Sequence, residues 1–225
     1  VSAATRIRPA PGLLSTESAA ELVEVYWQAL TRDVPFTDYA SNALTTAAVS
    51  DLNNKLHQIG PTVAGRLTTG SLFRGTTAGD LIGPYISQFM LADISFGPTR
   101  IAQRYAQPVA GNDFMKGWDE YLAIQNGRAP ARGDSLDATP RYVYNGRSLA
   151  NWVHSDFSYQ GFLNAALIAL GYGRAALSST NPYLGSANQG NFINFGGPDV
   201  LNLVAMAARI ALAGAWYQKW QVHRR

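Results

Sequence analysis

The sequence predicts an all-α protein built as a helical bundle. Apolar residues recur at three- and four-residue spacing in several segments, whereas no alternation of apolar and polar residues persists long enough to indicate a sheet. Helix start and stop signals bracket most of those segments. The chain has 225 residues, of which 47% are apolar, enough for one substantial core. We therefore expect one all-α domain over residues 1–225, with bundle packing.

The first half of the chain is expected to contribute three helices. A Ser-x-x-Glu capping box opens a helix over residues 18–30. A second apolar stripe predicts a helix over residues 41–59, ended by Gly60-Pro61. A Thr-x-x-Asp cap predicts a third helix over residues 77–92. Gly83-Pro84 must kink that third helix or delay its start.

The middle of the chain reads as irregular backbone around one helix. Residues 93–112 look extended or irregular. Asp113 can cap a helix that ends near Gln125, with Gly127 as its left-handed terminator. Residues 127–146 contain Gly, Pro and Arg, and we expect a loop there.

The last third predicts two long apolar helices. The first runs from Ser148 to about Gly171, and a loop rich in Gly, Asn and Ser follows over residues 178–197. Pro198 suits the first turn of the final helix. The pattern of that helix continues to Arg225, where the sequence stops. We therefore expect the chain to be the middle piece of a longer protein, with parts before and after it absent.

Composition excludes several classes of function. The chain has no cysteine, so disulfides, thiol nucleophiles and zinc–cysteine sites are excluded, and the compartment stays open. The N-terminus lacks the apolar core of a signal peptide, and no uninterrupted apolar run reaches the roughly 18–20 residues of a membrane span. Basic residues are not arranged in a run. We expect no nucleic-acid partner and no membrane partner.

Basic charge nevertheless collects towards the C-terminal end. Lys219 and His223 are four residues apart, so an α-helix would place both on one face beside Trp216, with Arg224 following. A lysine among tryptophans, with no acid nearby in sequence, suits an oxyanion in a dry pocket. Basic residues in the last turn of a helix are also stabilised by the helix dipole. A purely structural role for these residues therefore stays open.

Other candidate sites are weaker. His154 is interpreted as a core or interface histidine. The three histidines lack the spacing of a transition-metal site, and we expect no metal ligands from this chain. Residues 71–80 contain glycines but lack the Gly-Lys-Ser/Thr of a phosphate-binding loop.

Five stretches together carry a family resemblance. The last one reads Tyr-Gln-Lys-Trp-Gln-Val-His-Arg-Arg. The other four, in chain order, are residues 21–30 with 32–37, 72–75 with 83–89, 149–156 with 159–165, and 192–196. They resemble the vanadium-dependent haloperoxidases of the seaweed bromoperoxidase type and their bacterial relatives, whose vanadate-binding segment reads Lys-(Phe/Trp)-x-x-His-Arg-x-x-Arg-Pro. The resemblance covers nearly the whole chain.

The resemblance implies a largely helical fold and a peroxidase activity. Family members use hydrogen peroxide to oxidise bromide, iodide or sometimes chloride, and the resulting hypohalous acid halogenates a small organic acceptor. Their cofactor is vanadate, bound covalently by one histidine. Their subunits form dimers or larger homo-oligomers. Some members bind calcium in the loop that corresponds to residues 178–197. Ala187 and Gly190 stand where acids would be expected, so we predict no calcium there.

The resemblance also implies roles for individual residues. Lys219 matches the lysine that binds vanadate oxygens, and Trp216 matches a position on the halide side of the pocket. His223 and Arg224 match the motif as supporting residues. The covalent histidine and the other ligands would follow Arg225, so this chain alone is not expected to hold vanadate tightly.

Two other functions remain open. The related acid phosphatases carry a Lys-x6-Arg-Pro signature, which would require arginine directly after Arg225, one residue earlier than the haloperoxidase motif requires. A non-catalytic fragment that only assembles is the third possibility.

Overall fold

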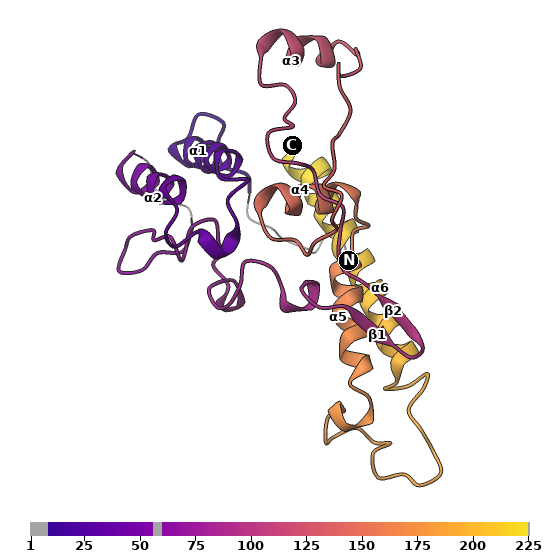
Figure 1. The fold of residues 1–225 in the computed structure, drawn as a ribbon. Helices are drawn as coiled ribbons and strands as arrows, with labels where there is room; N and C mark the ends of the chain where they lie inside the picture. The colour runs from indigo at the N-terminus through magenta and orange to yellow at the C-terminus, as the bar shows by residue number, and fades with distance from the viewer. Residues whose placement is uncertain (1–8, 56–59, 225) are drawn as a thin grey trace. The chain divides into compact units, whose positions relative to one another are not determined.

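The computed structural model describes residues 9–55 and 60–224 and is mostly helical (Figure 1). The helices and strands are α1 (Thr16–Leu30), α2 (Ala43–Lys55), β1 (Ile94–Phe96), β2 (Thr99–Ile101), α3 (Trp118–Gln125), α4 (Gly146–Ser155), α5 (Gln160–Gly171) and α6 (Gly197–Tyr217), which continues as a π-helical turn over Gln218–His223. Short 3₁₀ turns lie at Phe36–Asp38, Ala78–Asp80, Gln88–Met90 and Arg174–Ala176.

The backbone contacts divide the chain into two compact units. Among the described residues, the α1–α4 unit comprises 16–55, 60–86 and 104–155. The α5–α6 unit comprises 9–15, 87–103 and 156–224, and it contains the β1–β2 hairpin. Each unit is thus assembled from segments far apart in the sequence.

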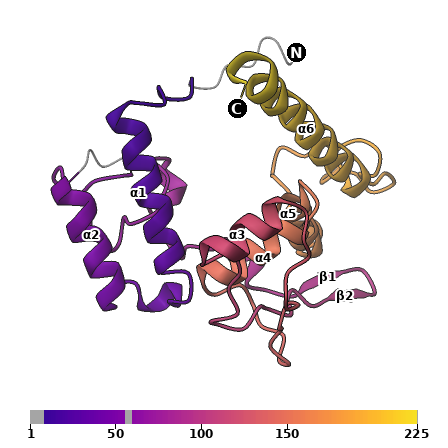
Figure 2. The same cartoon turned by 90° about the horizontal axis from the view of Figure 1, so that it is seen from above.

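The core of the α1–α4 unit lies between α1 and α2, which run side by side (Figure 2). Its buried residues are Ala48, Leu52, Leu67 and Leu72, with Val23, Trp27, Val49 and Phe73 packed against them. The indole Nε1 of Trp27 donates to Asp51 Oδ2 over 2.9 Å, so a polar tie accompanies the apolar contact between the helices.

Helix α4 begins at a reciprocal cap. The Ser148 backbone N–H donates to Asn145 Oδ1 over 2.8 Å, and the Asn145 N–H donates to Ser148 Oγ over 3.1 Å. Both residues are buried. Satisfying these donors inside the protein fixes the start of the helix. Gly146 favours this close approach, because a Cβ there would lie 3.2 Å from the Cα of Arg32.

In the α5–α6 unit, α5 packs against both β1 and α6 (Figure 1). The strands pair antiparallel with Ile94 opposite Ile101. Gln103, 1% exposed, donates from its Nε2 to the carbonyls of Phe89 and Ala92 and accepts from Asn164 Nδ2 over 2.7 Å. This buried amide ties the end of the hairpin segment to α5.

Much of the predicted helix pattern is confirmed. The helix predicted over residues 18–30 is α1, but it begins at Thr16, so Ser18 lies inside the helix and does not open it. Gly127 follows the end of α3 with φ +85°. The second predicted helix is α2, and its last residues, 56–59, lie outside the described residues. Pro198 occupies the first turn of α6. The expected loops over 127–146 and 178–197 contain no α-helix or strand except at their last residues, Gly146 and Gly197, which begin α4 and α6.

Three predictions of local structure are wrong. The single helix from Ser148 to Gly171 is broken between Ser155 and Gln160. Asp156 and Ser158 lie in the break, and such side chains compete with the helical backbone for hydrogen bonds. The third predicted helix, over residues 77–92, is replaced by two 3₁₀ turns separated by Gly83 at φ +82° and Pro84.

The start of α3 also differs from the prediction. The helix begins at Trp118 instead of following Asp113 directly. Met115 adopts φ +55°, a left-handed conformation that interrupts any helix there. The interval expected to be extended or irregular, 93–112, contains the β1–β2 hairpin as its one regular element.

Residues Gly197–His223 form the one described helix that is long and apolar enough to cross a membrane by length and composition, with mean hydropathy 1.5 over its most apolar window. One such helix is weak evidence for a span, because core helices of soluble proteins share these properties. Only 6% of that window is buried. Its exposed apolar residues include Leu203, Met206 and Ile210.

Candidate functional site

The residues expected to bind an oxyanion lie together at the end of α6. Trp216 and Trp220 are 59% and 55% exposed, and Lys219 and Arg224 are also exposed. The Lys219 Nζ lies 4.6 Å from the centroid of the Trp220 ring, a cation–π contact. This end of the α5–α6 unit therefore presents positive charge beside two indole rings.

The backbone here is π-helical instead of α-helical. Gln218–His223 form a π-helical turn, and the Arg224 N–H donates to the carbonyl of Lys219, five residues earlier. Arg224 itself is left-handed, with φ +57°. The expected alignment of Lys219 with His223 assumed α-helical spacing, which this turn does not have. Single π-helical turns inside helices are rare and frequently occur at functional sites.

The two cations of this turn lack carboxylate partners. Within the described residues, no ion pair joins Lys219 or Arg224 to an acid. His223 is half-buried, and its Nε2 is buried without a hydrogen-bond partner among the described residues. The turn thus has positive charge available for an external anion.

Acidic residues are scarce elsewhere in this unit. Asp156 has a buried Oδ1 with no partner among the described residues, and burial raises the pKa of its carboxyl. Asp199 accepts from the Phe195 N–H over 2.8 Å and thereby fixes the end of the loop before α6. The described residues contain no group of three His, Asp or Glu side chains suited to a metal ion.

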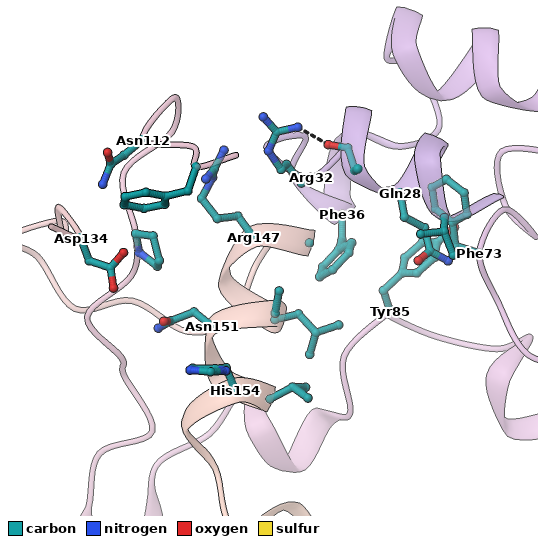
Figure 3. Close-up of a pocket in the computed structure, with 18 of the residues that line it drawn as sticks. Gln28, Arg32, Phe36, Phe73, Tyr85, Asn112, Asp134, Arg147, Asn151 and His154 are labelled. Carbon is teal, nitrogen blue, oxygen red and sulfur yellow. Dashed lines mark hydrogen bonds between the residues drawn. The ribbon is translucent and has the colours of Figure 1, made fainter. Parts of the chain in front are cut away.

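The α1–α4 unit contains a cavity of about 1020 Å³ (Figure 3). One wall is aromatic, made by Phe36, Tyr39, Phe73 and Tyr85. Phe36 and Tyr85 stack with ring centroids 5.3 Å apart, and the Tyr85 hydroxyl donates to the carbonyls of Thr69 and Leu72. Burial raises the pKa of both tyrosines. The tyrosines of this wall are therefore uncharged near neutral pH.

The opposite wall carries an ion network. Arg147 donates to both oxygens of Asp33 and, over 2.7 Å, to Asp113 Oδ1. Arg32 donates to the same Asp113 carboxylate over 2.6 Å and 3.1 Å. The Arg32 guanidinium is the largest influence holding the pKa of Asp113 far below its usual range. The pKa of Arg147 is raised by Asp33 and Asp113.

These ion pairs determine the charge that the cavity can present to a ligand. The arginine side chains at its wall are already matched by carboxylates, so they offer little net charge to an anion. His154 also lines the cavity and is exposed in this chain, so it is not a core histidine; its interpretation as an interface histidine stays a prediction. The network was missed in the sequence because its partners are 81 and 114 residues apart and share no local motif.

Searches with protein-family models found no match to this sequence. Curated relatives were found. The chain is 36% identical over 230 residues to a vanadium-dependent bromoperoxidase of Ascophyllum nodosum, which covers 98% of this chain and 41% of that protein. It is 33% identical over 261 residues to vanadium-dependent bromoperoxidases of Corallina pilulifera and Corallina officinalis, covering 96% of this chain and 43% of each.

A solved structure agrees with these relatives. The second vanadate-dependent bromoperoxidase of Ascophyllum nodosum, described as homohexameric, superposes with a TM-score of 0.83 at 31% identity. The match covers 98% of this chain and 37% of that one. Sequence and fold therefore agree on one conclusion: this chain is a homologue of the vanadium-dependent bromoperoxidases over nearly its whole length and spans about two fifths of theirs.

Proposed function

We propose that the protein containing this chain is a vanadium-dependent haloperoxidase. Bromide, or another halide, would lose two electrons to hydrogen peroxide and, with uptake of one proton, give hypohalous acid and water. The hypohalous acid would then halogenate a small organic acceptor. The observation that carries the proposal is Lys219, exposed and without an ion pair among the described residues, beside Trp220 in a chain homologous to bromoperoxidases.

The residues present fit part of a vanadate site. An oxyanion requires a cationic donor without a competing carboxylate, and Lys219, which is exposed and has no ion pair among the described residues, meets that condition. The chain's remaining cationic network, in the α1–α4 unit, is neutralised by acids and does not fit. The covalent histidine that the family resemblance implies is not among the residues assigned here.

Each residue of the turn would have a separate task. The Lys219 ammonium would donate hydrogen bonds to the anion's oxygens and balance its charge. Trp216 would line the halide side and keep water from it, and His223 and Arg224 would support the turn. Vanadate, when bound, supplies a Lewis-acidic centre that polarises peroxide for attack by halide.

The first experiment is a peroxide-dependent bromination assay on a diketone dye. The purified protein is measured before and after addition of orthovanadate, with phosphate as competitor. Activity that requires vanadate and falls with phosphate supports the haloperoxidase. A Lys219→Gln variant is the matched test of the site and should lose activity, whereas Lys116→Gln, an exposed lysine outside it, should not.

The assay also separates the alternatives. Hydrolysis of an aryl phosphate without bromination would favour a phosphatase and contradict the proposal. Neither activity, from a chain of the 24.3 kDa mass given by this sequence, would favour a non-catalytic assembly fragment.

We further propose that the protein forms a homo-oligomer. The solved relative is described as homohexameric. The exposed apolar residues of α6 leave surface that association would bury. Sedimentation velocity should give a mass above that of one chain, and a monomer at all concentrations would contradict this part of the proposal.

A further inference from the structure

We propose that the cavity of the α1–α4 unit is a binding site for an uncharged aromatic alcohol. Every residue that lines the cavity belongs to that unit. The proposal goes beyond the haloperoxidase function and does not depend on it, because Trp216 and Lys219 belong to the other unit.

Helix α4 presents two chemically different stripes of side chains to the cavity. Leu149 and Val153 line it and are four residues apart, so they form an apolar stripe. Asn151 and His154 also line it and are three residues apart, so they form a polar stripe. At α-helical spacing the small side chain of Ala150, another lining residue, falls between the two stripes. One ligand lying across Ala150 would therefore meet both stripes.

The apolar side of the cavity is built from aromatic rings that contact one another. Phe36 stacks on Tyr85 with ring centroids 5.3 Å apart, and Tyr39 lies 4.9 Å from the same Tyr85 ring. Figure 3 shows Phe36 and Tyr85 on one side of α4, and Asn151 and His154 on the other. Aromatic pairs gain energy beyond the area that they bury. This side therefore favours a ligand with an aromatic ring over an aliphatic one.

The polar side offers hydrogen bonds to a neutral group. Asn151 Nδ2 makes one long bond of 3.4 Å to the Ala106 carbonyl. His154 is exposed and has no hydrogen-bond partner among the residues that the structure describes. An amide and an imidazole can each donate and accept a hydrogen bond. A hydroxyl group, which also does both, is the matching group on a ligand.

The charges around the cavity favour neither an anion nor a cation. Arg32 and Arg147 are bound to Asp33 and Asp113, so they have little charge to offer an anion. Asp134, the carboxylate among the lining residues, also repels an anion. It is exposed, so an ion pair between Asp134 and a bound cation would be worth little. A charged ligand would thus lose water without gaining a full partner, which leaves an uncharged one.

The size of the cavity sets the size of the ligand. Its volume of about 1020 Å³ lies at the upper end of the range for small-molecule sites, roughly 300–1,000 Å³. A fused-ring aromatic body with one hydroxyl group therefore fits with space to spare.

The test compares four naphthalene probes by equilibrium dialysis against this chain at neutral pH. The probes are 2-naphthol, naphthalene, the 2-naphthoate anion and the 2-naphthylmethylammonium cation. We expect 2-naphthol to bind with a Kd on the order of 0.1 mM. Naphthalene should bind about fivefold more weakly, the worth of one neutral hydrogen bond. Both charged probes should bind at least about tenfold more weakly.

Two variants locate the bound probe. Ala150→Trp fills the space between the stripes and should weaken 2-naphthol binding at least about tenfold. Ala47→Trp, at an exposed position of α2 outside the cavity, is the matched control and should change it by less than about twofold. A double variant, Asn151→Leu with His154→Leu, should remove the advantage of 2-naphthol over naphthalene. Far-ultraviolet circular dichroism checks that each variant folds, and the double variant decides the result if Ala150→Trp does not.

Four results would overturn the proposal. They are no 2-naphthol binding up to roughly 1 mM, tighter binding of a charged probe, equal losses from Ala150→Trp and Ala47→Trp, or an advantage of 2-naphthol that survives the double variant. A second copy of the chain in the cavity is a further outcome against it. In that case 2-naphthol binding would fall as the chain concentration rises, and Ala150→Trp would weaken self-association in sedimentation velocity. Failure of the proposed function is distinguishable, because 2-naphthol binding is measured without vanadate, peroxide or halide.

Discussion

The two units of the molecule use their charged residues in opposite ways. In the α1–α4 unit, Arg32 and Arg147 are bound to Asp33 and Asp113 across long stretches of sequence. In the α5–α6 unit, Lys219 and Arg224 are exposed and have no such partner among the described residues. Charge therefore ties together distant segments of one unit and is exposed at the surface of the other.

The units also differ in how their buried polar groups are satisfied. The α1–α4 unit buries ions, with the Arg147 and Asp113 side chains only 10% and 11% exposed. The α5–α6 unit buries neutral amides, with Gln103 and Asn164 bonded to each other. A buried ion left unpaired costs more than a buried amide left unpaired. The comparison therefore predicts a larger penalty for breaking the first network than for breaking the second.

The largest effect is expected from Asp113→Asn. The change removes the shared partner of Arg32 and Arg147, so the free energy of unfolding should fall by about 3 kcal/mol. Urea titration followed by far-ultraviolet circular dichroism measures the loss. Lys116→Gln is the control, since that side chain is 66% exposed and should cost less than about 0.5 kcal/mol. A loss for Asp113→Asn no larger than the control's would break the comparison.

Gln103→Leu should have a smaller effect. It leaves the Phe89 and Ala92 carbonyls and the Asn164 amide without their partner, at a cost of about 2 kcal/mol. The same urea titration applies, with the exposed Gln189→Leu as a control expected within about 0.5 kcal/mol. If the Gln103 variant proves more destabilising than Asp113→Asn, the ranking of ions above amides is wrong.

Trp27→Phe should cost less again, about 1 kcal/mol. The ring remains between α1 and α2, and the bond from Nε1 to Asp51 is lost. Thermal unfolding of the variant should shift down, while Trp118→Phe, at an exposed α3 position, should not change it. An unchanged midpoint for Trp27→Phe would mean that packing alone joins α1 to α2.

The smallest effects concern pH and have opposite signs in the two units. The pKa of Asp113 is lowered, so its contribution to stability is present above its unfolded pKa and is lost as pH falls through the folded pKa. The pKa of Asp156 is raised, so stability from its protonated form is present at low pH and is lost as pH rises through the folded pKa. Asp113→Asn should flatten the acid side of the stability profile.

Asp156→Asn should instead raise stability near neutral pH. It removes a carboxylate that burial disfavours in its charged form. Stability profiles from urea titration at a series of pH values check both changes. A destabilised Asp156→Asn at neutral pH would show that the carboxylate has a stabilising partner and would contradict this prediction.

The sequence predicted the elements whose signals are local. Gly127 after α3 and Pro198 in the first turn of α6 each act within one helical turn. The capping pattern at Ser18 found the right helix but the wrong first residue, because α1 begins at Thr16. Errors arose where a local signal was ambiguous. Apolar residues recur at helical spacing both before and after Asp156. This spacing predicted a single helix, whereas the chain forms two helices, α4 and α5.

The candidate site was predictable only in part. Trp216, Lys219, His223 and Arg224 do lie together at the end of one helix, as expected from their closeness in sequence. Their orientation was not predictable, because no residue pattern distinguishes an α-helical from a π-helical turn at Gln218–His223. The ion network around Arg147 could not be predicted from the sequence either, because its members come from distant segments.

The unmatched cations at the end of α6 also bear on how fast an anion arrives. Exposed charges act on an approaching ion over about one Debye length, roughly 8 Å at physiological ionic strength. Association of an oxyanion with Lys219 and Arg224 should therefore slow as salt is added. The paired arginines of the α1–α4 unit would show little such dependence, because their fields are cancelled at short range by Asp33 and Asp113.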